Sequence, residues 1–269
     1  MKRRIVLVTN SPGLALRFLH DYGDRLNRLE VSVPLVITVY PSMQFTDRIR
    51  DLRGKIRRQA RINQISRTAQ LLRHFAYRWF NRSSGKSPVQ SWIEQLRECC
   101  RVLEVESIND QDAVASIREG NFDFGISIKS DQLSRHTLDA IDVPMFNVHY
   151  SDPAFVRGLP PVFWEVLDHR DSIRITLHRV TAQLDAGDIL LQRDVPIDWR
   201  RTLRETMRAT CQSAVGVVIE QVMTGIEKLC DGSAEFRVFE PGPLRTTPGI
   251  AQILQAEAIC QRRFAGEDR

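Results

Sequence analysis

The chain has 269 residues, 42% of them hydrophobic and 26% charged, a composition ordinary for a soluble globular protein. Its net charge of +5 comes from one segment, because Asp47 to Lys86 alone has a balance of +10 and the rest of the chain is at −5. No apolar run approaches the roughly 20 residues of a membrane span, and the five cysteines form no CxxC pair, which argues against an integral membrane protein, a disulfide framework and a zinc site. The apolar run at 5–8 is too short for a signal peptide, so we expect a cytoplasmic protein.

The first half of the chain alternates strands with helices. Short apolar runs predict strands at 5–8, 31–40, 102–105, 124–128 and 145–149. Helical periodicity predicts helices at 12–22, 110–119 and 133–141. This alternation indicates βαβ units, so we expect an α/β fold with a doubly wound, mostly parallel sheet. In such sheets ligands bind beyond the carboxyl ends of the strands.

A basic insertion at 46–88 interrupts this alternation. Apolar residues recur at steps of three or four between Ile49 and Trp79, and arginine dominates the polar positions, so we expect one or two amphipathic helices. Three interpretations stay open. The helices pack on the domain with a solvated basic face, or they dock an acidic substrate or partner, or they make peripheral contact with an anionic membrane through 47–86.

The second half of the chain differs in pattern from the first. Periodicity predicts a helix at 164–168, an antiparallel pair of strands at 173–178 and 189–195, a long helix at 202–230 and a short helix at 249–262. We therefore expect a catalytic domain at 1–200, which carries the insertion at 46–88, and a C-terminal helical extension at 201–269.

Three polar residues stand where such a sheet binds its ligands. Asn147 and His149 end an apolar strand, and Asp185 lies on a turn with Gly187. Asn147 and His149 can donate hydrogen bonds to a developing oxyanion, and His149 can also pass protons near neutral pH. Asp185 can hold His149, raise its pKa and accept a proton. Each residue taken singly is more often a turn former or a satisfied core residue, but together they indicate a catalytic site that uses no metal.

The motifs and their order resemble the formyltransferase family. The elements that carry the resemblance are Asn147-x-His149, Ser151, Arg157-Gly158, Thr176-x-His178 and Asp185-x-Gly187-x-Ile189, within roughly residues 100–200. The resemblance implies a Rossmann-like formyltransferase fold and 10-formyltetrahydrofolate as the formyl donor. It also implies that Asn147, His149 and Asp185 are the catalytic residues.

The same resemblance implies binding positions. The donor is expected to contact Ile128, Lys129, Ser130, Leu133, Gln183, Leu184 and Asp188. The acceptor is expected to contact Ser151, Arg157, Gly158 and Trp164. The sequence departs from the family pattern at Lys129-Ser130-Asp131, which is unusually polar, and at Asp188, where Pro is common. Thr176 and His178 share one strand face and are expected to support the site.

The segment from Arg157 to Trp164 resembles the sugar N-formyltransferases, in which an aromatic residue follows the Arg-Gly turn. We therefore expect transfer of a formyl group to a primary amine of a nucleotide- or lipid-linked amino sugar, with no nucleic acid as partner. An oligomer is compatible with the sequence. Two alternatives stay open: formylation of an amino-acid side chain or a hydroxylamine in a natural-product pathway, and a catalytically silent binding protein of the same fold.

Overall fold

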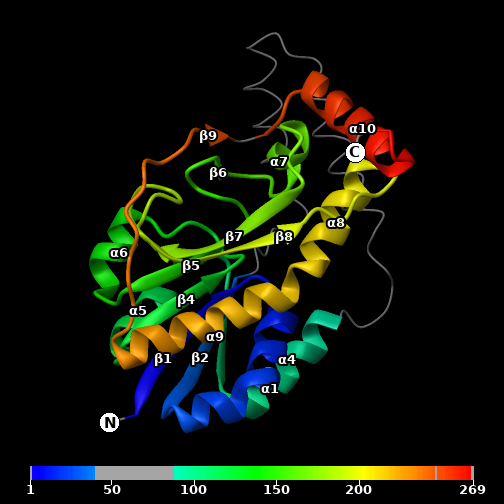
Figure 1. Ribbon diagram of the computed structural model, residues 1–269. Coiled ribbons are helices and arrows are strands. Elements are labelled where there is room, and N and C mark those ends of the chain that lie inside the picture. Colours follow the sequence, from blue (N-terminus) through cyan, green and yellow to red (C-terminus); the bar gives the residue numbers. More distant parts are fainter. Residues whose placement is uncertain (1, 40–87, 246, 268–269) are drawn as a thin grey trace, which may run out of the picture.

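A seven-stranded sheet forms the centre of the protein (Figure 1). The computed structural model describes residues 2–39, 88–245 and 247–267. In spatial order the strands run β3, β2, β1, β4, β5, β7 and β8. Their bounds are Arg3–Thr9 (β1), Val31–Val39 (β2), Arg101–Val105 (β3), Phe124–Ile128 (β4), Met145–His149 (β5), Ser172–Arg179 (β7) and Ile189–Pro196 (β8). Neighbours from β3 to β5 pair in parallel and only β7 runs antiparallel to its neighbours, which confirms the predicted sheet.

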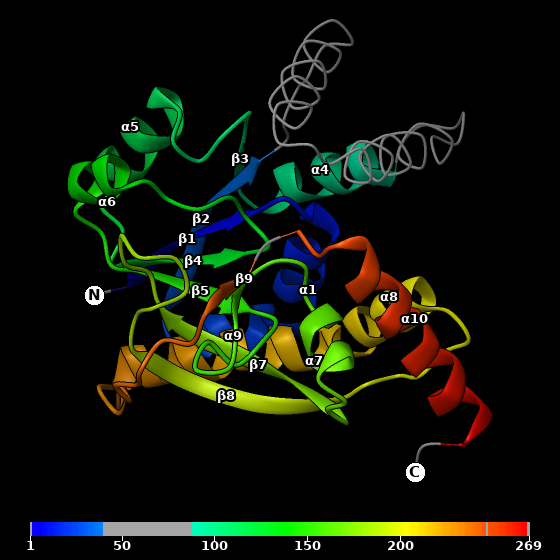
Figure 2. The same cartoon turned by 90° about the horizontal axis from the view of Figure 1, so that it is seen from above.

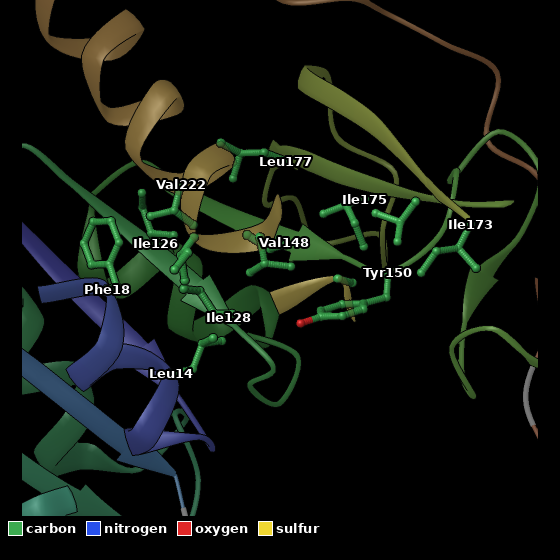
Figure 3. Close-up of a cluster of buried hydrophobic side chains, with 14 of the residues drawn as sticks. Leu14, Phe18, Ile126, Ile128, Val148, Tyr150, Ile173, Ile175, Leu177 and Val222 are labelled. Atoms are coloured by element: carbon green, nitrogen blue, oxygen red, sulfur yellow. The ribbon is translucent and has the colours of Figure 1, made fainter. Parts of the chain in front are cut away.

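Helices cover both faces of this sheet (Figures 1 and 2). The helices of one face are α1 (Pro12–Arg28), α4 (Pro88–Cys99) and α9 (Val215–Asp231), and those of the other are α5 (Gln111–Glu119) and α6 (Arg135–Ile141). Figure 3 shows part of the core on the α1 and α9 face, where Phe18 and Val222 surround Ile126 of β4. β4 is buried at every position because helices cover both faces of the sheet there, and all its residues except Ser127 are apolar or glycine.

The strand order places a topological switch point between β1 and β4. The chain winds from β1 outward through β2 to β3, and then returns to β4 on the other side of β1 and continues to β5. The carboxyl ends of β1 and β4 are joined where the Asn10 N–H donates to the Lys129 carbonyl at 3.1 Å. A crevice at this place is the usual ligand site of a doubly wound sheet.

The C-terminal part of the chain packs into the same core as the strands. Its helices are α8 (Leu203–Ser213), α9 and α10 (Ile250–Ala265), and α10 packs against the short helix α7 (Phe163–Leu167). Between α9 and α10 the tail runs back along the sheet, and its strand β9 (Leu244–Arg245) pairs with β6 (Arg157–Gly158) (Figure 1). The described part of residues 201–269 thus shares the core of the domain, and the boundary at residue 200 stays a prediction.

The structure differs from the sequence-based expectations at four elements. The predicted helix at 202–230 is two helices that meet at Ala214, where the Ser213 hydroxyl donates to the Thr210 carbonyl, a bond of the kind that bends helices. α1 continues to Arg28, beyond the predicted end at residue 22, because Leu26 is also buried. The helix α4 and the pair β6–β9 were not predicted, since each adds few apolar positions to the sequence pattern.

The basic insertion lies outside the described residues, so the predicted amphipathic helices and their membrane or partner contact stay predictions. In the part of the chain that the structure describes, no helix combines the length and apolar character needed to cross a membrane.

Phe146 lies on β5, one residue before Asn147, and its ring contacts the C-terminal tail. Its ring packs edge-on against the ring of Phe124, with 6.1 Å between the ring centres, and stacks on the ring of Phe236, with 6.0 Å between the centres. We predict that Phe146→Ala lowers the free energy of unfolding by about 3–5 kcal/mol, measured by urea denaturation, because it leaves a cavity at a fully buried site. The matched control Phe264→Ala, at a position 56% exposed, is expected to cost far less. Equal losses in both variants would contradict this view of the core.

Candidate active site

A cavity of about 560 Å³ opens at the carboxyl ends of β1, β4 and β5. This volume is typical of a small-molecule site. Four polar side chains form one wall: Asn147 and His149 from β5, His178 from β7, and Asp185 from the loop between β7 and β8. The structure thus brings the three predicted catalytic residues together and adds a second histidine to them.

The pairing of β5 with β7 explains why His178 joins the site. In this antiparallel pair Asn147 stands opposite His178, and His149 stands opposite Thr176. Residues two apart on a strand share a face, so all four side chains point the same way. The register of the β5–β7 pair therefore places His178 beside Asn147. The sequence alone indicated only a supporting role for His178.

Hydrogen bonds fix the orientation of the Asn147 amide. His178 Nδ1 lies 2.8 Å from the Arg179 carbonyl oxygen, which can only accept, so Nδ1 carries the proton. In the neutral ring Nε2 is then an acceptor, and it receives a hydrogen bond from Asn147 Nδ2 at 3.3 Å. One amide N–H of Asn147 is held in this way and the second is left to point at a ligand.

His149 is 8% exposed, and its two ring nitrogens face different acceptors. Nε2 lies 3.4 Å from the Val156 carbonyl oxygen and Nδ1 lies 3.6 Å from Asp185 Oδ2. Burial lowers the pKa of His149, and this effect outweighs the opposing charge of Asp185. The charge of Asp185 does raise this pKa, as expected, but burial of the ring has the larger effect. The imidazole is neutral at neutral pH.

Asp185 is charged although it is buried. Burial opposes its ionisation, but the contacts with the His178 and His149 rings and the hydrogen bond from the Gly158 N–H together hold its pKa below the ordinary value. The Gly158 N–H donates to Oδ2 at 3.1 Å, and Oδ1 lies 3.7 Å from His178 Nε2. One carboxylate thus contacts β6, β5 and β7 at the same time.

The loop that carries Asp185 has a tightly constrained backbone. Asp185 has a φ of 47°, in the left-handed region that Asp tolerates better than most residues. A Cβ atom at Gly187 would lie 2.0 Å from the Arg179 carbonyl oxygen, so only glycine lets the loop pass the end of β7. The Asp-x-Gly motif is therefore required by close packing as well as by chemistry.

Three of the four residues predicted to contact the amine acceptor do not line the cavity. Arg157 donates to the Gly242 carbonyl at 2.7 Å and to the Leu184 carbonyl at 3.1 Å, so it ties the C-terminal tail to the Asp185 loop. The Ser151 hydroxyl donates to buried Glu165, and the Trp164 ring N–H donates to the Leu159 carbonyl at 3.4 Å. Gly158 alone of the four lines the cavity, and the proposed contacts with an acceptor stay predictions.

The predicted donor positions divide in a similar way. Lys129, Ser130, Leu133 and Leu184 line the cavity. Ile128 is buried in the core, the Gln183 carbonyl accepts from the Thr181 hydroxyl, and the Asp188 carbonyl accepts from the Arg179 N–H. Their roles in donor binding stay predictions.

Sequence reasoning missed several residues that line the cavity. Asn10 and Tyr150 do so because they directly follow β1 and β5, so the rule that ligands bind at carboxyl strand ends could have found them. Cys211 comes from α8, and no local signal marks it. Within the described residues, no group of three or more His, Cys, Asp and Glu side chains is arranged to hold a metal ion.

Comparison with known proteins identifies the family. A family model described as formyl transferase matches residues 19–222, more than half of the chain. The chain belongs to the formyl transferase family. The resemblance that the motifs indicated is thereby confirmed, and with it the enzyme class at the level of the family.

Individual relatives are more distant. A methionyl-tRNA formyltransferase from Roseiflexus castenholzii is 33% identical over 116 residues, which cover 42% of this chain and 37% of that protein. The match thus spans little more than a third of the relative.

Two solved structures share the fold over nearly the whole chain. One is a 4-N formyltransferase from Francisella tularensis, with a TM-score of 0.57 and 16% identity, covering 98% of this chain and 88% of that one. The other is an N-formyltransferase from Helicobacter canadensis in complex with folinic acid and dTDP-3-aminofucose, with a TM-score of 0.57 and 12% identity, covering 97% and 81%. At such identities the likeness concerns the fold.

Gly187 offers a direct test of the loop geometry. We predict that Gly187→Ala lowers the free energy of unfolding by roughly 1–3 kcal/mol and reduces activity, because the added methyl group displaces the Asp185 loop from β7. The control is Gly216→Ala in α9, where nothing lies within 4 Å of an added Cβ. That change is expected to be neutral or stabilising. Equal behaviour of the two variants would contradict the packing argument.

The neutral state of His149 predicts a pH dependence of stability. The pKa of His149 in the folded protein is below its ordinary value of 6.5, so the unfolded chain binds a proton first as the pH falls. Stability is therefore lost as the pH drops below about 6.5, and His149→Gln is expected to reduce this loss between pH 7 and 5.

Urea denaturation at several pH values measures this effect. His136→Gln, at an exposed position of α6, is the matched control and should retain the wild-type slope. A slope unchanged by His149→Gln would mean that the buried ring is not held neutral.

Proposed function

We propose that this protein transfers a formyl group from 10-formyltetrahydrofolate to a primary amine, with a nucleotide- or lipid-linked amino sugar as the first candidate acceptor. The observation that carries the proposal is the convergence of Asn147, His149 and Asp185 at one strand end within a ligand-sized cavity. Family membership supports formyl transfer as the reaction. It is the combination of this family and an intact polar cluster that argues against a catalytically silent binding protein.

The donor site is proposed to lie between the loop after β4 and the Asp185 loop. Leu133, Val180 and Leu184 offer apolar contacts that suit a flat heterocycle. The Ser130 hydroxyl is buried in the same loop and has no hydrogen-bond partner, so a bound ligand with polar edges would satisfy it. The residues present therefore fit a folate. A protein of this fold that was solved with folinic acid supports the same choice.

Formyl transfer forms a bond between the acceptor nitrogen and the formyl carbon and breaks the bond from that carbon to N10 of the folate. The folate supplies the formyl group and a leaving nitrogen that must gain a proton. In this chain the free N–H of Asn147 is placed to donate to the developing oxyanion. One such donor typically lowers the activation free energy by about 3 kcal/mol.

Proton transfer is assigned to His149 and Asp185. The Val156 carbonyl favours a proton on His149 Nε2, which leaves Nδ1 as a base that faces Asp185 at 3.6 Å. When Nδ1 accepts the proton that the amine loses, the carboxylate of Asp185 stabilises the imidazolium. The same proton can then be delivered to N10, so the ring returns to its neutral state.

Several observations bear on the identity of the amine acceptor. An amino-sugar acceptor is supported by the aromatic residue after the Arg-Gly turn and by a protein of this fold that was solved with dTDP-3-aminofucose. The match to a methionyl-tRNA formyltransferase favours methionyl-tRNA as a second candidate, although it spans little more than a third of that relative. Amino-acid side chains and hydroxylamines remain alternative acceptors. The cytoplasmic location, the metal-free reaction and an oligomeric state stay predictions.

The catalytic assignment is tested by steady-state kinetics. We predict that Asn147→Ala, His149→Ala and Asp185→Ala each lower kcat by roughly 10²–10³-fold with the best amine acceptor. Because these residues act on the transferred group, calorimetric affinity for folinic acid should change by only a few fold. His136→Ala is the control for loss of an exposed histidine and should keep wild-type kcat. Full turnover in His149→Ala would remove the proposed role of that residue.

A further inference from the structure

The cavity wall contains residues from both faces of the sheet. Leu133 and Val180 pack in the hydrophobic cluster of α5 and α6, which is the side where the donor is proposed to bind. Tyr150 and Cys211 pack in the cluster of α1 and α9 on the opposite face. The catalytic residues lie between these two sides, so a donor on one side leaves the other side for the acceptor.

Lys129 also lines the cavity, and its position connects these two sides. It follows β4 directly, and its φ of 54° lies in the left-handed region, which is costly for a residue with a Cβ. This turn places its ammonium group 4.9 Å from the centre of the Tyr150 ring. The predicted donor residue Lys129 thus directs its side chain toward Tyr150, away from the apolar contacts at Leu133.

Lys129 forms no salt bridge among the described residues, although Asp131 and Asp185 line the same cavity. Among those residues, it is the one Lys or Arg that lines the cavity. A lysine held over an aromatic ring in this way keeps its charge available, since the ring attracts the ammonium without neutralising it.

Tyr150 beside it has an unsatisfied hydroxyl group. The side chain is 5% exposed, and the hydroxyl is buried without a hydrogen-bond partner, which costs stability in the free protein. In Figure 3 the hydroxyl points away from Ile173 and toward the side of Ile128 and Leu14. Burial, reinforced by Cys211, raises the pKa of Tyr150, so the group is a neutral donor at every physiological pH.

We propose that Lys129 and Tyr150 form a subsite for a phosphate group of the amine acceptor. This inference rests on the proposed function and adds the substrate class, a phosphorylated amine. Lysine binds phosphate as a point charge, and a phenol O–H can donate to one of its oxygens. Lys129, Tyr150 and His149 line the same cavity, so a phosphate held by the first two keeps the rest of the acceptor in the cavity of the catalytic residues.

The test uses the full chain, with inorganic pyrophosphate as the probe, in calorimetric titrations at low ionic strength. Lys129→Met is expected to weaken binding by about tenfold or more, and Lys129→Arg to retain most of it. Tyr150→Phe is expected to weaken binding several fold while its melting temperature stays equal or rises, because an unpaired buried hydroxyl is removed. Lys228→Met in α9 is the matched loss of charge away from the cavity and should bind as the wild type does.

Folinic acid, titrated in parallel, separates the acceptor from the donor. The donor contact expected at Lys129 is with the backbone of its loop, and its ammonium group lies over Tyr150, so folinic acid affinity should stay within twofold in Lys129→Met. If folinic acid affinity falls and pyrophosphate affinity does not, the lysine serves a carboxylate of the donor and the proposal is wrong. No pyrophosphate binding by the wild type would overturn it as well. If folinic acid fails to bind the wild type but the pyrophosphate pattern holds, the proposed function fails and the phosphate subsite stands.

Competition identifies the source of the phosphate. Displacement of pyrophosphate by dTDP indicates a nucleotide-linked acceptor, and displacement by a short-chain phosphatidic acid indicates a lipid-linked one. Either result supports the subsite, and failure of both compounds to displace pyrophosphate contradicts it.

Discussion

The charge on Asp185 is the interaction on which the site depends. A buried carboxylate is stable only when surrounding groups favour its ionised form. Here the Gly158 N–H donates to the carboxylate and the rings of His149 and His178 lie against it, and each of the three comes from a different part of the fold. His178 also contacts the Asn147 amide, so the carboxylate is connected to every member of the site. Neutralising Asp185 would therefore disturb every member of the site.

The backbone is arranged to bring this carboxylate to the end of β5. The loop between β7 and β8 passes β7 so closely that Gly187 is required. On its other side, Arg157 binds the loop at the Leu184 carbonyl and the C-terminal tail at the Gly242 carbonyl. Residues more than fifty positions apart thus position one carboxylate. A site on such a loop depends on the packing of the tail as much as on the sheet.

Much of this arrangement could be predicted from the sequence. Apolar runs predict the strands, because the central strands of a parallel sheet covered on both faces are mostly apolar. Five motif elements in order, among them Asn147-x-His149 and Asp185-x-Gly187, were enough to predict the family. Local patterns of this kind are visible in a sequence because each arises within a few neighbouring residues.

The remainder depends on contacts between distant segments. The pairing of Asn147 with His178 follows from strand register, and the role of Arg157 follows from where the tail returns, so neither leaves a local signal. The net direction of the His149 pKa shift leaves no local signal in the sequence either. Burial of the ring and the charge of Asp185 act in opposite directions, and only the depth of burial decides between them.

The most direct test of the account is a titration with folinic acid at pH 7, followed through the ring nitrogens of the histidines by nitrogen-15 NMR and assigned with His149→Gln. The account predicts a neutral His149 ring before addition, and saturable shifts of His149 and His178 as the formyl-bearing ligand fills the site. A protonated His149 at pH 7, or signals of both rings that do not respond to the ligand, would contradict it.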